Sequence, residues 1–140
     1  MIQRLQTLWL LFAAGLAFAS LKLSFFSGNL LVNNVKQFQR FTAMSSIFLM
    51  ILTVAVAIAA LIAIFLYKNR KTQLKITIAV FVVSLVNVLL AYMQTKNFVP
   101  DEWSYDISSV TYIAIPVLVA FAIRGIYKDE KLVKSADRLR

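Results

Sequence analysis

Four long runs of apolar residues, with almost no charge inside them, dominate this chain. They lie at about 5–26, 43–67, 74–93 and 107–127 of its 140 residues. An α-helix rises about 1.5 Å per residue and the bilayer hydrocarbon is about 30 Å thick, so about 20 apolar residues can cross it. Each run reaches that length. The sequence therefore predicts an all-α membrane protein, a bundle of four transmembrane helices forming a single domain over 1–140.

Composition supports this class and argues against enzymatic chemistry. Hydrophobic residues make up 61% of the chain and charged residues 15%, against about 25% charged in soluble proteins. The chain has neither cysteine nor histidine, which removes thiolate chemistry, the commonest metal ligand and the commonest general base. We therefore expect no metal, no cofactor and no catalytic residue, and a protein that is not an enzyme.

The basic residues predict the orientation. With the N-terminus inside, eleven Lys and Arg lie on the cytoplasmic side and four outside, and such residues are retained inside. Both termini are thus predicted to be cytoplasmic. The basic residues predicted to be cytoplasmic could bind anionic lipid head groups or a partner protein. We therefore interpret the net charge of +9 as a consequence of membrane orientation and lipid binding, and not as a sign of nucleic-acid binding. That set is Arg4, Lys68, Arg70, Lys71, Lys75, Arg124, Lys128, Lys131, Lys134, Arg138 and Arg140; the outside set is Lys22, Lys36, Arg40 and Lys96.

The first run has an alternative interpretation. Its AFA triplet at 17–19, before Ser20, is similar to the cleavage site of a signal peptide. Apolar residues resume at Leu21 and continue to Phe26, so we predict a retained first helix.

The two outside loops are less regular. In 22–42, the turn signal Ser27-Gly28-Asn29 favours a small β-hairpin, whereas Leu31, Val35, Phe38 and Phe41 at helical spacing favour a surface helix or an extension of the second span. Both remain open. In the second loop, Asp101, Glu102 and Asp106 are expected to favour the positive N-terminal end of the fourth helix, with a cation site as the weaker alternative.

Inside the spans, small and mildly polar residues predict helix contacts. Ser84, Asn87 and Ala91 share one helical face, on which Asn87 is expected to hydrogen-bond across the bundle or, alternatively, to line a polar path. A second candidate contact face comprises Ala55, Ala59 and Ala63, with Ala13 and Ala17 on the first helix, and Pro116 is expected to kink the fourth helix.

The tail at 128–140 predicts a short amphipathic helix. Leu132, Val133, Ala136 and Leu139 fall on one stripe, and the basic face could rest on anionic lipid or dock to a cytoplasmic partner.

Both ends of the chain resemble a known family. The start MIQRLQT and the ending KDEKLVKSADRLR are similar to those of small bacterial inner-membrane proteins grouped as a domain of unknown function. The resemblance implies four spans in the bacterial inner membrane and supplies no catalytic residue, cofactor or substrate. It also implies that both recognisable ends form one cytoplasmic surface.

Three function classes follow. The first is a small structural or accessory subunit of an inner-membrane assembly. The second is an oligomeric transporter or channel with the Ser84 and Asn87 face as its polar lining. A membrane enzyme is the least favoured, because only the outside carboxylates could act as catalysts.

Overall fold

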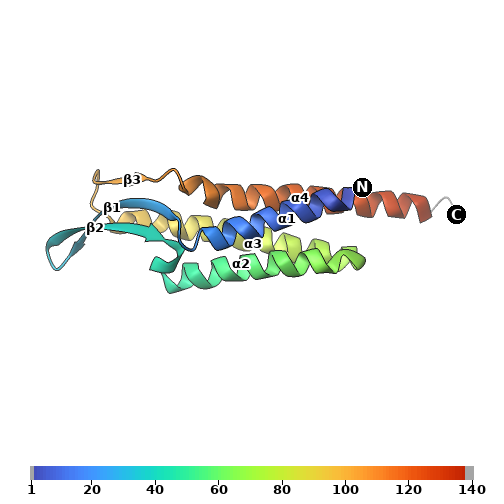
Figure 1. The fold of residues 1–140 in the computed structure, drawn as a ribbon, viewed down its shortest axis with the longest axis horizontal. Helices are drawn as coiled ribbons and strands as arrows, with labels where there is room; N and C mark the ends of the chain where they lie inside the picture. The colour runs from blue at the N-terminus through green and yellow to red at the C-terminus, as the bar shows by residue number, and fades with distance from the viewer. Residues whose placement is uncertain (1, 138–140) are drawn as a thin grey trace.

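Four helices run along the long axis of the molecule, and a small sheet covers one end of them (Figure 1). The computed structural model describes residues 2–137, without the side chains of 2–4, 134, 136 and 137. The helices are α1 (Ile2–Ala19), α2 (Ile47–Phe65), α3 (Arg70–Gln94) and α4 (Ser109–Asp137), with 3-10 turns η1 (Ala43–Ser45), η2 (Leu66–Lys68) and η3 (Thr95–Asn97). Each helix packs against two others, in the ring α1–α2–α3–α4 that closes from α4 to α1. The start of α1 and the end of α4 lie at the same end, away from the sheet.

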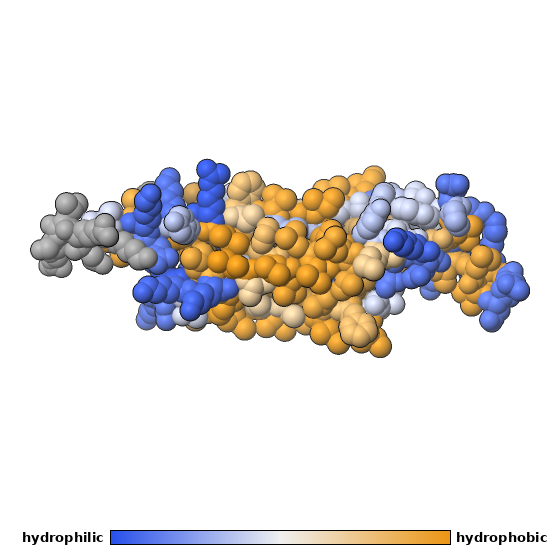
Figure 2. Space-filling view, turned by 180° about the vertical axis from the view of Figure 1, so that it is seen from behind, coloured by the Kyte–Doolittle hydropathy of each residue, from blue (hydrophilic) through white to orange (hydrophobic). Residues whose placement is uncertain are grey.

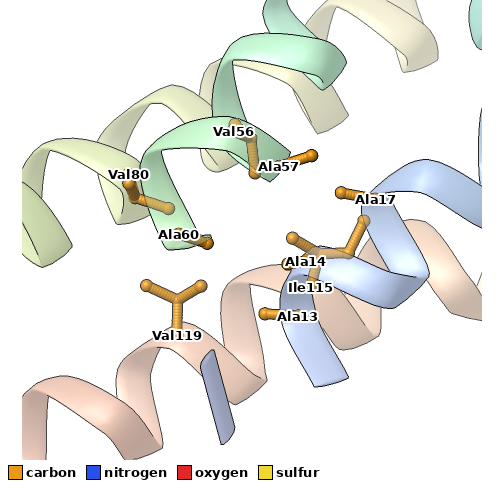
Figure 3. Packing of buried hydrophobic residues seen from close by; sticks show 9 residues of the cluster. All are labelled: Ala13, Ala14, Ala17, Val56, Ala57, Ala60, Val80, Ile115 and Val119. Carbon is orange, nitrogen blue, oxygen red and sulfur yellow. The ribbon is translucent and has the colours of Figure 1, made fainter. Parts of the chain in front are cut away.

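A repeat of alternating three- and four-residue steps forms the core of the bundle. This spacing keeps one stripe of each helix facing its neighbours, as in a coiled coil. At mid-height the stripes carry alanine and valine, and small residues of this kind let helices approach closely (Figure 3). The buried stripes are Gln6, Leu10, Ala13, Ala17 and Ser20 along α1; Leu49, Thr53, Val56, Ala60 and Ala63 along α2; Gln73, Thr77, Val80, Ser84, Asn87 and Ala91 along α3; and Tyr112, Ile115, Val119, Ala122, Ile126 and Asp129 along α4.

The all-α prediction is wrong, because the α1–α2 and α3–α4 connections, which were predicted as outside loops, form a three-stranded antiparallel sheet. Strands β1 (Ser24–Val32) and β2 (Val35–Thr42) form a hairpin, and β3 (Trp103–Tyr105) pairs with the other edge of β1. The hairpin turns at Asn33 and Asn34, whose φ angles are 52° and 63°. Two consecutive left-handed residues make the two-residue turn that suits the twist of a hairpin, and asparagine tolerates this conformation.

Of the two interpretations of the first loop, the hairpin is the one that the structure contains, but its turn lies at Asn33 and Asn34 instead of Ser27-Gly28-Asn29. Gly28 lies within β1, where a side chain is not tolerated because a Cβ would stand 2.4 Å from Cβ of Trp103 on β3. The helical spacing of Leu31, Val35 and Phe38 is coincidental, since these residues are exposed on two paired strands.

The first apolar run, at 5–26, belongs partly to a helix and partly to a strand. Helix α1 ends at Ala19, and Phe25 and Phe26 belong to β1. Their rings enter an aromatic cluster beneath the sheet with Phe41, Phe98 and Tyr112. These residues are therefore apolar because they bury the underside of the sheet, and not because they extend a spanning helix.

Three helical segments among the described residues are long and apolar enough to cross a membrane. They are Ile47–Lys68, Arg70–Asn97 and Ser109–Val133, while the apolar helix Leu5–Ala19 is shorter. On the face drawn in Figure 2, apolar residues form a belt across the middle of the molecule, and hydrophilic residues gather toward both ends, mixed with apolar residues at the sheet end. Helix α4 continues through Pro116 and past Tyr127 to Asp137 without a break, so the predicted separate tail helix is the last part of α4.

Candidate functional site

Buried polar side chains gather where the two ends of the chain meet. Nε2 of Gln6 on α1 donates a hydrogen bond to Oδ2 of Asp129 on α4 at 2.7 Å, and Nη1 of Arg70 on α3 donates to the Asp129 backbone oxygen at 3.2 Å. Nearby, Nε2 of Gln73 donates to the backbone oxygen of Ala63 at 3.0 Å. We call Gln6, Arg70, Gln73 and Asp129 the clasp, because these four residues connect all four helices.

The clasp is tightly fitted. Asp129 is 7% exposed, and a carboxylate so deeply buried requires hydrogen-bond partners. Gly125, one turn earlier on α4, leaves room for Gln6, since a Cβ at position 125 would lie 2.7 Å from Cγ of Gln6. The remaining space beside the clasp is about 10 Å³, which is about the size needed for one water molecule. This geometry holds helices together and does not provide a substrate pocket.

The predicted basic surface lies around the clasp. Lys68, Lys71, Lys75, Arg124, Lys128 and Lys131 are exposed, whereas Arg70 is partly buried by its bond to Asp129. Arg138 and Arg140 lie outside the described residues, and the side chains of Arg4 and Lys134 are not described either.

The predicted polar face of α3 points into the bundle. Nδ2 of Asn87 donates to Oγ1 of Thr53 on α2 at 2.8 Å, which is the expected hydrogen bond across the bundle. Ser84 Oγ donates to the backbone oxygen of Phe81 within α3 at 2.7 Å, and Ala91 is fully buried. These residues therefore act as helix contacts in this structure, and the Asn87 amide oxygen is buried without a partner.

The predicted alanine face of α2 coincides only partly with the buried face of the helix. Ala63 is buried and Ala59 is partly buried, but Ala55 is exposed. Because an α-helix has about 3.6 residues per turn, residues spaced strictly four apart move gradually around the helix. The buried stripe stays on one face because its steps alternate between three and four residues. On α1, Ala13 and Ala17 are fully buried in the central core, and Pro116 is buried within α4.

Two of the three acidic residues at the other end, Glu102 and Asp106, accept hydrogen bonds from strand β1 or β2, while Asp101 is exposed. Glu102 accepts hydrogen bonds from Lys36 and, at 3.0 Å, from Nδ2 of Asn29, while Asp106 accepts one from Ser27 at 2.9 Å. The Lys36 ammonium, followed by the Asn29 amide, lowers the pKa of Glu102. Within residues 2–137, no group of three or more acidic side chains is placed to hold a metal ion.

The family comparison spans both ends of the chain that the clasp brings together. The family model described as "Domain of unknown function (DUF4293)" matches residues 2–139. The chain belongs to the DUF4293 family. The resemblance that we drew from the two terminal motifs is thereby confirmed, and Gln6 in the first motif bonds to Asp129 in the second. No curated protein and no solved structure matches the chain.

Sequence reasoning missed Gln6, Gln73 and Asp129 as core residues. A signal for them exists, because each continues the alternating three- and four-residue spacing of its helix by one step. Polar residues at the end of an apolar stripe are hard to distinguish from polar residues at a helix end that faces water.

Proposed function

We propose that this protein is a small accessory subunit of a bacterial inner-membrane assembly, with the clasp end in the cytoplasm. The spans, the basic excess at the clasp end and the family membership support this placement. The clasp contributes structure rather than chemistry, because its side chains are occupied by bonds between helices.

The observation that carries the proposal is the length of α4. This helix runs for 29 residues and extends well beyond the α2–α3 connection at the same end of the bundle (Figure 1). Its last turns expose apolar Leu132 and Val133, at the end of the candidate span Ser109–Val133, beside Lys128 and Lys131. An amphipathic helix end that projects past the other described helices is suited to lie in a groove of another protein (Figure 1).

The direction of α4 favours a protein partner over the lipid surface for this segment. A helix that binds the head-group layer lies in the plane of the membrane, whereas α4 continues along the bundle axis without a break. The basic residues of the α2–α3 connection, Lys68 and Lys71, lie closer to the apolar belt and are better placed to meet anionic head groups.

The test is affinity isolation of the full chain from bacterial membranes in a mild detergent, followed by quantitative mass spectrometry. Wild type should recover one membrane partner in near-equal amount. The double variant Lys128→Glu and Lys131→Glu should lose that partner, and the matched variant Lys68→Glu and Lys71→Glu should keep it. Both variants are checked for presence in the membrane fraction. Retention of the partner by the α4 variant, or recovery of the chain alone from wild type, would overturn the proposal.

A further inference from the structure

A second, larger pocket lies at the sheet end of the bundle. Its volume is about 250 Å³, and β2, η1, α3 and η3 all contribute to its walls. Leu30, Phe41 and Phe98 form the apolar part of the lining, and the polar part comprises Gln39, Arg40, Ser45, Gln94 and Asn97.

The aromatic part of the pocket is held rigidly. Phe41 stacks on Phe26 with ring centroids 4.7 Å apart, and Phe98 meets Phe26 edge-on at 4.9 Å. All three rings are buried in the cluster beneath the sheet. The pocket is therefore formed without a ligand, as most small-molecule sites are.

The polar part of the pocket offers hydrogen-bond donors. Arg40 is exposed. The carboxylate of Glu102 pairs with Lys36, and no ion pair of Arg40 occurs among the described side chains. Gln94 Oε1 accepts from Nδ2 of Asn97 at 2.6 Å, so the Gln94 amide has its NH₂ group left to donate. No acidic residue lines the pocket. Arginine with amide donors and no carboxylate is an environment for an anion, and the guanidinium fork matches phosphate.

The position of the pocket indicates where such an anion comes from. Ser45 lies just before the candidate span that begins at Ile47, and Asn97 is the last residue of the candidate span of α3. The pocket therefore lies at the edge of the apolar belt. Beside it, Met44 in η1 and Ile47 and Phe48 at the start of α2 are exposed apolar residues.

We propose that this pocket binds the phosphate group of a membrane phospholipid, with the acyl chains lying on the exposed start of α2. The inference rests on the membrane-spanning part of the proposed function and is independent of any protein partner. Pockets for drug-sized ligands measure about 300–1,000 Å³, so about 250 Å³ suits a compact head group. A soluble phosphate ester shares this chemistry, and the experiment separates the two sources.

The experiment uses the purified full chain in mild detergent, with bound lipid measured by native mass spectrometry and by the shift in Tm. The probes are phosphatidylglycerol, the diacylglycerol with the same acyl chains, and glycerol phosphate. Wild type should retain phosphatidylglycerol in preference to diacylglycerol. Arg40→Gln should weaken that binding about tenfold or more, because a charge-assisted hydrogen bond is lost. Lys96→Gln is the matched control, since Lys96 is exposed near the pocket but does not line it.

Equal phosphatidylglycerol binding by Arg40→Gln and wild type, or equal binding of diacylglycerol, would overturn the proposal. Glycerol phosphate binding as tightly as the lipid, and lost in Arg40→Gln, would overturn the lipid source and assign the pocket to a soluble phosphate ester. The Arg40→Gln variant is also tested in the affinity isolation described above. If it recovers the protein partner, a loss of lipid binding concerns this inference alone and leaves the accessory-subunit proposal standing.

Discussion

At the scale of single residues, the polar side chains that bond one helix to another lie toward the two ends of the bundle. Gln6, Gln73 and Asp129 form such bonds at the clasp end, and Asn87 and Thr53 form one nearer the sheet, whereas buried Thr77 and Ser84 between them bond within α3. A buried polar group is costly unless it is paired, so a helix that slipped by one turn would leave several of these groups unpaired. These pairs therefore set the register of helices whose small core residues would tolerate sliding.

Gly125 provides a direct test of the clasp. Replacing a helical glycine with alanine usually stabilises a helix by about 0.5–1 kcal/mol, and Gly15→Ala should do so because a Cβ there has nothing within 4 Å. Gly125→Ala brings the same gain in helix propensity, but its Cβ forces the Gln6 side chain away from Asp129. Overpacking costs about 1–3 kcal/mol, so Gly125→Ala should unfold at a lower temperature than Gly15→Ala in detergent. Equal Tm values for the two variants would contradict a tightly fitted clasp.

At the scale of elements, the sequence predicts helices, which follow from local length and apolarity. It does not predict the sheet, which depends on pairing between distant segments. The second and third helices were located to within a few residues because their length and apolarity are local properties. The sheet was missed as a fold element because β3 is three residues long and pairs with a strand about 75 residues earlier. The end of α1 was misplaced because Phe25 and Phe26 are equally apolar whether they face lipid or the aromatic cluster.

The same limit applies to the sites. Asn87 was identified from spacing within one helix, and its bond to Thr53 is present. The clasp combines residues separated by 123 positions, so no local spacing could join them.

The hairpin turn predicts the effect of substituting Asn34. Its φ of 63° costs other L-residues about 1–2 kcal/mol, and a β-branched residue is especially poor there. Asn34→Val should therefore lower Tm, whereas Asn34→Gly should keep or raise it, since Asn-Gly is a preferred pair for this turn. The side chain is exposed, so packing does not complicate the comparison. A Val variant as stable as the Gly variant would contradict the left-handed turn.

The link between the hairpin and the second loop predicts a dependence on pH. The pKa of Glu102 is lowered from 4.5, mainly by its hydrogen bond with Lys36. Because the folded state binds this proton more weakly than the unfolded chain, the interaction stabilises the fold above the ordinary pKa and is lost as pH falls through the lowered one. Thermal unfolding of wild type and Glu102→Gln should therefore differ at neutral pH and converge as the pH falls below the ordinary pKa of a glutamate. A Tm difference that persists in acid would show that Glu102 acts by other means.

At the scale of the whole molecule, the two ends of the bundle are different. One end is covered by the sheet, with its aromatic cluster and acidic links, and the other carries the clasp, the basic residues and the free end of α4. The apolar belt separates them (Figure 2). Both proposals build on this difference, because the proposed partner surface and the proposed phosphate pocket lie at opposite ends of the bundle.

The central claim is therefore that the bundle crosses the membrane with the sheet outside and the clasp inside. Since the chain has no cysteine, single cysteines introduced by Lys22→Cys beside the sheet and by Lys68→Cys beside the clasp can report the side that each faces. Both positions are exposed. With a membrane-impermeant maleimide on intact spheroplasts, Lys22→Cys should be labelled at once and Lys68→Cys only after the membrane is disrupted. Labelling of Lys68→Cys in intact spheroplasts, with Lys22→Cys protected or equally labelled, would contradict the account.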